Sequence, residues 1–135
     1  MSESNIILDY AKGFAGLLEN IVNPLNEKSS FKEKFKNTQR KFLINATNLN
    51  YAALIIINEG QLSVKSVPNK PKSNLKKKSI GWDGLVSMDT QTFLAFAMKR
   101  ISIIKLGLKW IFGPVQIKGI FKLFPMMKLF ALLQE

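Results

Sequence analysis

The chain has 135 residues, of which 20 are Lys or Arg and 9 are Asp or Glu, so its formal net charge is +11. The length fits one domain over residues 1–135, and a field of this sign attracts polyanions such as nucleic acid or anionic lipid headgroups. Because the sequence contains no Cys and no His, disulfides, Cys/His zinc sites, thiol nucleophiles and histidine acid–base chemistry are excluded.

The first part of the chain predicts helix. Residues 6–22 carry apolar side chains at three- and four-residue spacing, which is typical of an amphipathic helix. The Asn-Pro step at 23–24 predicts its end. The polar stretch 25–40 fits either a short helix, with Phe31 and Phe35 one turn apart, or a solvated connector.

A three-strand meander follows. Residues 40–47 (RKFLINAT) and 51–58 (YAALIIIN) predict strands, the second β-branched and apolar enough to be central in a sheet. The Glu-Gly step at 59–60 predicts a tight turn in which the glycine takes a positive φ. Residues 61–67 (QLSVKSV) alternate between apolar and polar side chains, as a half-buried strand does.

The chain then passes through a Pro-, Asn- and Lys-rich segment, residues 68–80, which predicts a loop. A short strand is expected over 83–88, and Asp89 is placed to cap the helix that begins after it. Beyond it we expect helices over 89–100 and 101–112, a brief strand in PVQIKG, and a last helix that starts or kinks near Pro125.

The final third of the chain is unusually apolar, with 21 apolar residues among the 33 from 101 to 133. The apolar side chains of the last helix cover nearly its whole circumference, whereas a helix packed on one side needs only a stripe. We therefore expect a surplus apolar face for a ligand, a membrane or a partner subunit. Lysines interrupt every candidate span, so no transmembrane helix is expected.

Three parts of the sequence together resemble the sterol carrier protein type 2 domain, a lipid-binding fold. YAALIIINEGQLSV resembles the family's apolar strand, tight turn and alternating strand, and GLVSMDTQTFLAFAMK resembles its strand, small polar-Asp step and helix. WIFGPVQIKGIFKLFPMMKL is similar to its aromatic helix end, Gly-x-hydrophobic-x-Ile-x-Gly pattern and apolar terminal helix. The resemblance covers residues 38–133, the expected core, and more loosely the helix over 6–22.

The resemblance implies an α/β domain of the α+β kind, in which helices cover a five-stranded, mostly antiparallel sheet and enclose an apolar tunnel. The tunnel would hold a fatty acid, an acyl-CoA, a sterol-like molecule or another apolar lipid. The residues that the resemblance places along it, each of which is also compatible with ordinary core, are Leu54, Ile56, Phe93, Phe96, Ala97, Ile104, Leu108, Ile111, Ile117, Ile120, Phe121, Phe124 and Met127. Pro114 and Pro125 depart from the family's pattern, and the chain ends in LLQE without a peroxisomal SKL signal.

The run Lys76, Lys77 and Lys78 has two interpretations. It could contact anionic headgroups at a membrane surface, or it could be a solvated loop. A nucleic-acid-associated protein is the rival from another class, but residues 65–80 hold six Lys and no aromatic residue, so specific nucleic-acid binding is not expected. A dimeric scaffold that buries the apolar face between subunits remains a further alternative.

No paired-carboxylate, Gly-rich phosphate or nucleophile motif occurs in the sequence, so we expect no catalytic residue, no metal site and no enzyme activity. The lipid would be the ligand, and no other cofactor is expected. The N-terminus MSESNIILDY lacks the basic region of a secretory signal. Together with the resemblance, which implies the lipid carrier, these features predict a cytoplasmic, non-enzymatic protein, monomeric or weakly dimeric, that can contact membranes peripherally.

Overall fold

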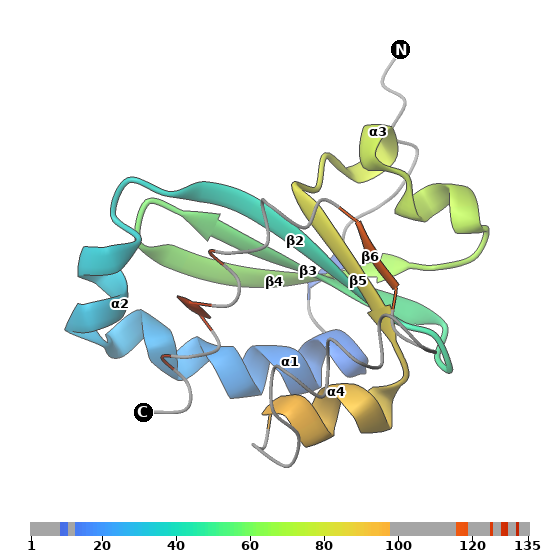
Figure 1. Ribbon diagram of the computed structural model, residues 1–135, viewed down its shortest axis with the longest axis horizontal. Coiled ribbons are helices and arrows are strands. Elements are labelled where there is room, and N and C mark those ends of the chain that lie inside the picture. The colour runs from blue at the N-terminus through green and yellow to red at the C-terminus, as the bar shows by residue number, and fades with distance from the viewer. Residues whose placement is uncertain are drawn as a thin grey trace.

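A computed structural model describes residues 9–10, 13–97, 116–118, 125, 128–129 and 132 (Figure 1), with the backbone alone at 9–10, 96–97 and 116. Its strands are β1 (Asp9–Tyr10), β2 (Gln39–Ala46), β3 (Tyr51–Asn58), β4 (Gln61–Pro68), β5 (Gly84–Met88) and β6 (Gln116–Lys118). Its helices are α1 (Phe14–Val22), α2 (Ser29–Lys34), α3 (Lys77–Ile80) and α4 (Thr90–Ala97), with 3-10 turns η1 (Asn23–Glu27) and η2 (Lys72–Leu75).

The strands form one mixed sheet in the order β1-β4-β3-β2-β5-β6. The pair β2–β5 is parallel, whereas β1–β4, β4–β3, β3–β2 and β5–β6 are antiparallel. The five strands β2 to β6 confirm the expected α+β architecture with a mostly antiparallel sheet, and the two-residue β1 extends it at the β4 edge.

The predicted helix over 6–22 is confirmed for Phe14–Val22 and is wrong for Asp9 and Tyr10, which form β1 opposite Ser66 and Lys65. Gly13 separates the two, with a φ of 57° that lies outside the helical range. The outer edge of β4 also offers backbone groups that a short strand can pair. The spacing of apolar residues could not show that residues 9–10 pair with β4 instead of extending α1.

The turn between β3 and β4 has the predicted conformation. Glu59 and Gly60 both have positive φ, 50° and 84°, as a two-residue type I′ turn requires. The backbone of α2 lies against this turn, since a Cβ atom on Gly60 would be in ordinary contact, at 3.4 Å, with the backbone oxygen of Lys32. Of the two alternatives for residues 25–40, the helix is the one found, and it buries both Phe31 and Phe35.

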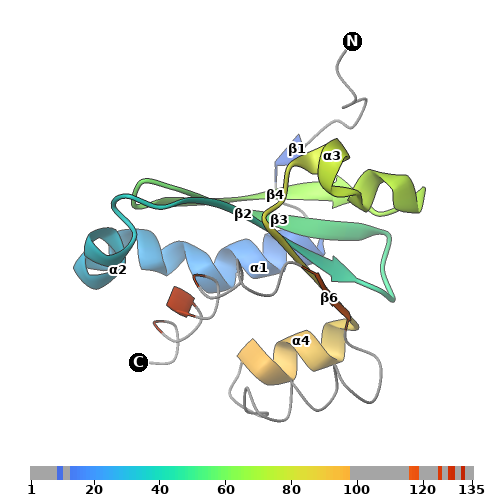
Figure 2. The ribbon, with the colours of Figure 1, turned by 45° about the horizontal axis from the view of Figure 1, so that its top comes forward.

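The helices lie on two sides of the sheet (Figures 1 and 2). α1, α2 and α4 are on one side, which we call the helix face, and η2 and α3 are on the other, which we call the loop face. The segment over 68–80, predicted as a loop, thus contains two short helical turns. It is anchored to the sheet by buried Ile80 and Trp82, whose Nε1 donates to the backbone oxygen of Leu75 at 2.7 Å.

Asp89 caps α4 as predicted, because its Oδ1 accepts a hydrogen bond from the Thr92 backbone N–H at 2.6 Å. We expect Asp89→Ala to lower the free energy of unfolding by about 1 kcal/mol, since the amides of the first helical turn lose an acceptor. Asp89→Asn keeps an acceptor oxygen and should cost clearly less. Urea unfolding of the two variants checks this, and equal losses would show that the cap is not the cause.

Candidate functional site

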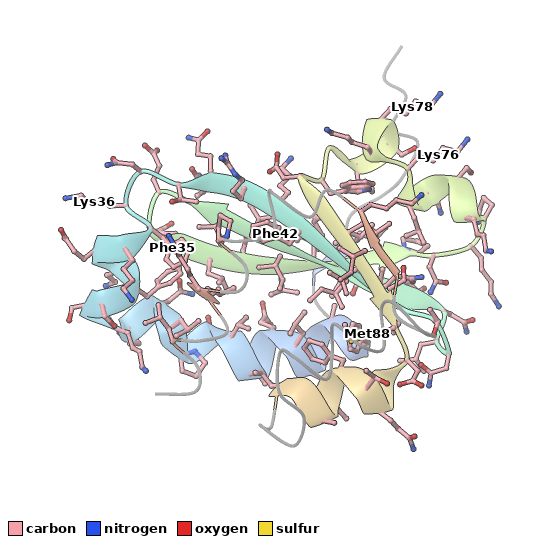
Figure 3. The ribbon with its side chains drawn as sticks, in the orientation of Figure 1. Phe35, Lys36, Phe42, Lys76, Lys78 and Met88 are labelled. Carbon is pink, nitrogen blue, oxygen red and sulfur yellow. The ribbon has the colours of Figure 1, made fainter. Side chains whose placement is uncertain are left out.

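The helix face carries one continuous apolar cluster. Because side chains alternate along a strand, β2 contributes Phe42, Ile44 and Ala46, while β3 contributes Ala53, Ile55 and Ile57. Leu62 and Val64 from β4 and Val86 and Met88 from β5 complete the floor. Figure 3 shows Phe42 and Met88 among these side chains, above α1 and α4.

The helices cover this floor with aromatic and aliphatic side chains. α1 contributes Phe14, Ala15, Leu18 and Val22 from a single side of the helix. Phe14 meets Phe93 of α4 edge to face, with ring centroids 5.4 Å apart and planes at 81°, a favourable arrangement for two aromatic rings. These contacts hold α1 and α4 side by side over the sheet.

The margin of the cluster is less completely covered. Ile21 of α1, Leu94 of α4 and Ile117 of β6 pack against it but are only partly buried. They are the described apolar side chains through which the cluster reaches accessible space. The sequence predicts Ile117 as a lining residue but not Ile21 or Leu94, because an apolar helix position does not reveal how far its neighbours cover it.

The end of the chain returns to the same cluster. Leu129 and Leu132 are buried in it, and Pro125, Lys128, Leu129 and Leu132, the described residues of the predicted last helix, are helical. The Nζ of Lys28 donates to the backbone oxygen of Leu132 at 3.0 Å, across 104 positions of sequence. This hydrogen bond and the burial of Leu129 and Leu132 tie these two described residues to the N-terminal half.

The structure brings only some of the predicted lining residues together. Phe93 and Ile117 lie in or against the helix-face cluster, whereas Leu54 and Ile56 lie on the loop face, near Trp82 and Leu85. β3 is apolar on both faces, so its sequence could not tell which alternate set faces the helices. The side chains of Phe96 and Ala97, and the residues Ile104, Leu108, Ile111, Ile120, Phe121, Phe124 and Met127, are outside what the structure describes, as is the closure of any tunnel.

Lys76 precedes α3, Lys77 and Lys78 are its first two residues, and all three are exposed on the loop face. Figure 3 shows Lys76 and Lys78 on the opposite side of the sheet from Met88. The lysine run and the helix-face cluster therefore occupy different faces of the molecule. No helix within the described residues is long and apolar enough to cross a bilayer.

No family model matches this chain, and no curated protein matches its sequence. Solved structures do match. A structure named UbiJ-SCP2 ubiquinone synthesis protein is 12% identical, with a TM-score of 0.63 over 91% of this chain and 96% of that one. The conserved hypothetical protein TT1886 of Thermus thermophilus, titled a possible sterol carrier protein, is 12% identical, with a TM-score of 0.58 over 93% of this chain and 90% of that one.

This chain has the sterol carrier protein type 2 fold. The same fold relates it to the sec-alkylsulfatase Pisa1 of Pseudomonas sp., at 17% identity and a TM-score of 0.51, over 75% of this chain and only 14% of that chain. This chain therefore spans nearly the whole length of the first two structures. It corresponds to only a small part of the alkylsulfatase. In this chain, the larger of the two buried apolar clusters lies on the helix face of the sheet.

Proposed function

We propose that this protein is a non-enzymatic lipid carrier that holds an apolar lipid on the helix face of its sheet. The observation that carries the proposal is the apolar cluster shared by the sheet, α1, α4 and the C-terminal segment. The fold supports it, since one structural neighbour is titled a possible sterol carrier protein. The lipid would enter where Ile21, Leu94 and Ile117 leave the cluster partly uncovered.

The energetics of such a site need no specific polar contact. Each methylene removed from water contributes about 0.8 kcal/mol, so ten buried methylenes supply about 8 kcal/mol. Part of this is offset by the lost freedom of the chain and the protein. Because micromolar affinity corresponds to about 8 kcal/mol after this offset, more than ten methylenes must be buried, and a long acyl chain supplies them. The large apolar content of residues 101–133 supplies further surface for the same purpose.

Native mass spectrometry of the purified protein, followed by solvent extraction, tests the proposal. We expect a bound acyl or isoprenoid lipid at one molecule per chain that is released on denaturation. The lipids offered to the delipidated protein should include fatty acids, an acyl-CoA, a sterol and ubiquinone, the last because another neighbour is named a ubiquinone synthesis protein. A protein that stays free of lipid and binds none of these compounds would refute the carrier function.

A further inference from the structure

The loop face holds a groove of about 800 Å³ that the lipid-carrier proposal does not use. Its walls come from the β2–β3 turn, the segment over 69–77, β5 and β6, which lie far apart in the sequence. We call it the lysine groove. It is lined by Asn45, Thr47, Leu49, Asn69, Lys70, Lys72, Ser73, Leu75, Lys76, Lys77, Trp82, Leu85, Ser87 and Lys118. Its volume is within the range of small-molecule binding sites.

The charge of the lysine groove has one sign. Five of its lining residues are lysines, and none is acidic. Within the described part of the chain, none of the five ammonium groups has a hydrogen bond or an ion pair. Like charges gathered around one concave surface repel one another and raise the local concentration of anions. The groove is therefore arranged to favour a multiply charged anion.

The segment that carries most of these lysines is fixed by its own hydrogen bonds. The Nδ2 of Asn74 donates to the backbone oxygens of Pro68 and Lys70, at 3.1 and 3.3 Å. The Oγ of Ser79 donates to the backbone oxygen of Ser73 at 2.9 Å. Ile80 and Trp82 anchor the end of the segment in a buried cluster with the sheet. Holding the backbone in place reduces the entropy lost when the lysines gather around an anion.

Neutral polar groups line the floor of the groove. Asn69 is 6% exposed, and its Nδ2 donates to Asn45 Oδ1 at 3.0 Å and to the Leu49 backbone oxygen at 2.9 Å. Because Asn45 uses its Oδ1 to accept from Asn69, its own Nδ2 points away from Asn69. The Nδ2 of Asn45 has no hydrogen-bond partner among the described residues. The half-buried Asn45 amide is therefore a neutral donor available at the floor of the groove.

We propose that the lysine groove is a second binding site, on the face opposite the lipid, that takes a compact ligand with clustered phosphoryl groups. Several adjacent phosphoryl oxygens match several ammonium donors, and the Asn45 amide adds a neutral donor. Single-stranded nucleic acid fits less well, because its binding relies on exposed aromatic rings. The one aromatic residue in the lining, Trp82, is 7% exposed, and its Nε1 is engaged with Leu75.

Calorimetry with inorganic tripolyphosphate, at about 0.15 M salt, tests the site on the full chain. The groove variant combines Lys72→Gln, Lys77→Gln and Lys118→Gln, which lie in η2, α3 and β6. The matched control combines Lys32→Gln, Lys34→Gln and Lys36→Gln, at α2, and loses the same charge. We expect one site per chain, weakened about tenfold or more in the groove variant and about threefold or less in the control.

Vesicles identify where the phosphoryl groups come from. Phosphatidylcholine vesicles carrying either phosphatidylinositol 4-phosphate or phosphatidylserine, matched in total charge, are sedimented with the same three proteins. Tripolyphosphate binding without selective vesicle binding assigns the groove to free polyphosphates. Tripolyphosphate binding together with selective binding of phosphatidylinositol 4-phosphate assigns it to a phosphorylated headgroup. Equal weakening in both variants, or no binding of either probe, would overturn the proposal. Delipidated protein serves in both assays, so failure of the carrier function leaves this test intact.

Discussion

Phe93→Ala is expected to lower the free energy of unfolding by about 3–5 kcal/mol. Phe93 is 1% exposed, and its ring contacts Phe14 edge to face. Removing the ring leaves a cavity between α1, α4 and the sheet that close-packed neighbours fill only partly. The variant also loses the aromatic contact itself, which contributes about 0.5–1.5 kcal/mol beyond the buried area.

Urea unfolding followed by circular dichroism measures this effect. The neighbouring variant Leu94→Ala is the control, because Leu94 lies on the same helix but is only partly buried. It should lower the free energy of unfolding by about half as much or less. Because alanine is the best helix former, neither loss can come from helix propensity. Similar losses in the two variants would show that the contact with Phe14 does not determine the result.

The second large effect concerns lipid binding. Leu94→Gln together with Ile117→Gln should weaken the binding of a long-chain fatty acid by about 30-fold or more. Each substitution places an amide against the apolar ligand, which costs about 1–3 kcal/mol when no hydrogen bond compensates it. Because both side chains are only partly buried in the cluster, we expect the folded state to persist.

Displacement of a fluorescent fatty acid gives the affinity, and thermal unfolding verifies the fold. Leu17→Gln is the control, since Leu17 belongs to α1 but is 39% exposed. This variant should bind the fatty acid as the unsubstituted protein does. If the double variant keeps full affinity while folded, the lipid does not enter at the margin formed by Leu94 and Ile117, and the proposed entry point is wrong.

Much of the sheet could be predicted from the sequence, because its signals are local. The run YAALIIIN is β-branched and apolar, and it is followed by a Glu-Gly turn whose conformation needs few neighbours. The Asp89 cap depends only on the residues next to it. The signals for these elements lie within a few neighbouring residues, which is why their positions could be inferred from short stretches.

Other features depend on contacts that no short stretch encodes. The face on which Leu54 lies depends on which side α1 packs against, and β3 is apolar on both sides. The lysine groove joins Asn45, Lys72 and Lys118 from three separate parts of the chain. The sequence showed an excess of positive charge and the run at 76–78, but only the folded sheet shows that Lys76 and Lys77 line the groove and that Lys78 does not.

The parallel pair β2–β5 has a consequence for the order in which the molecule assembles. β2, β3 and β4 are consecutive and antiparallel, so each can pair with the next one across a short turn. β5 can join β2 only after the chain has passed from β4 through η2 and α3 across the loop face, and closing that longer loop is slower. We therefore expect the meander to form first, and the lysine groove and the contact of α4 with α1 to form only after β5 has joined β2.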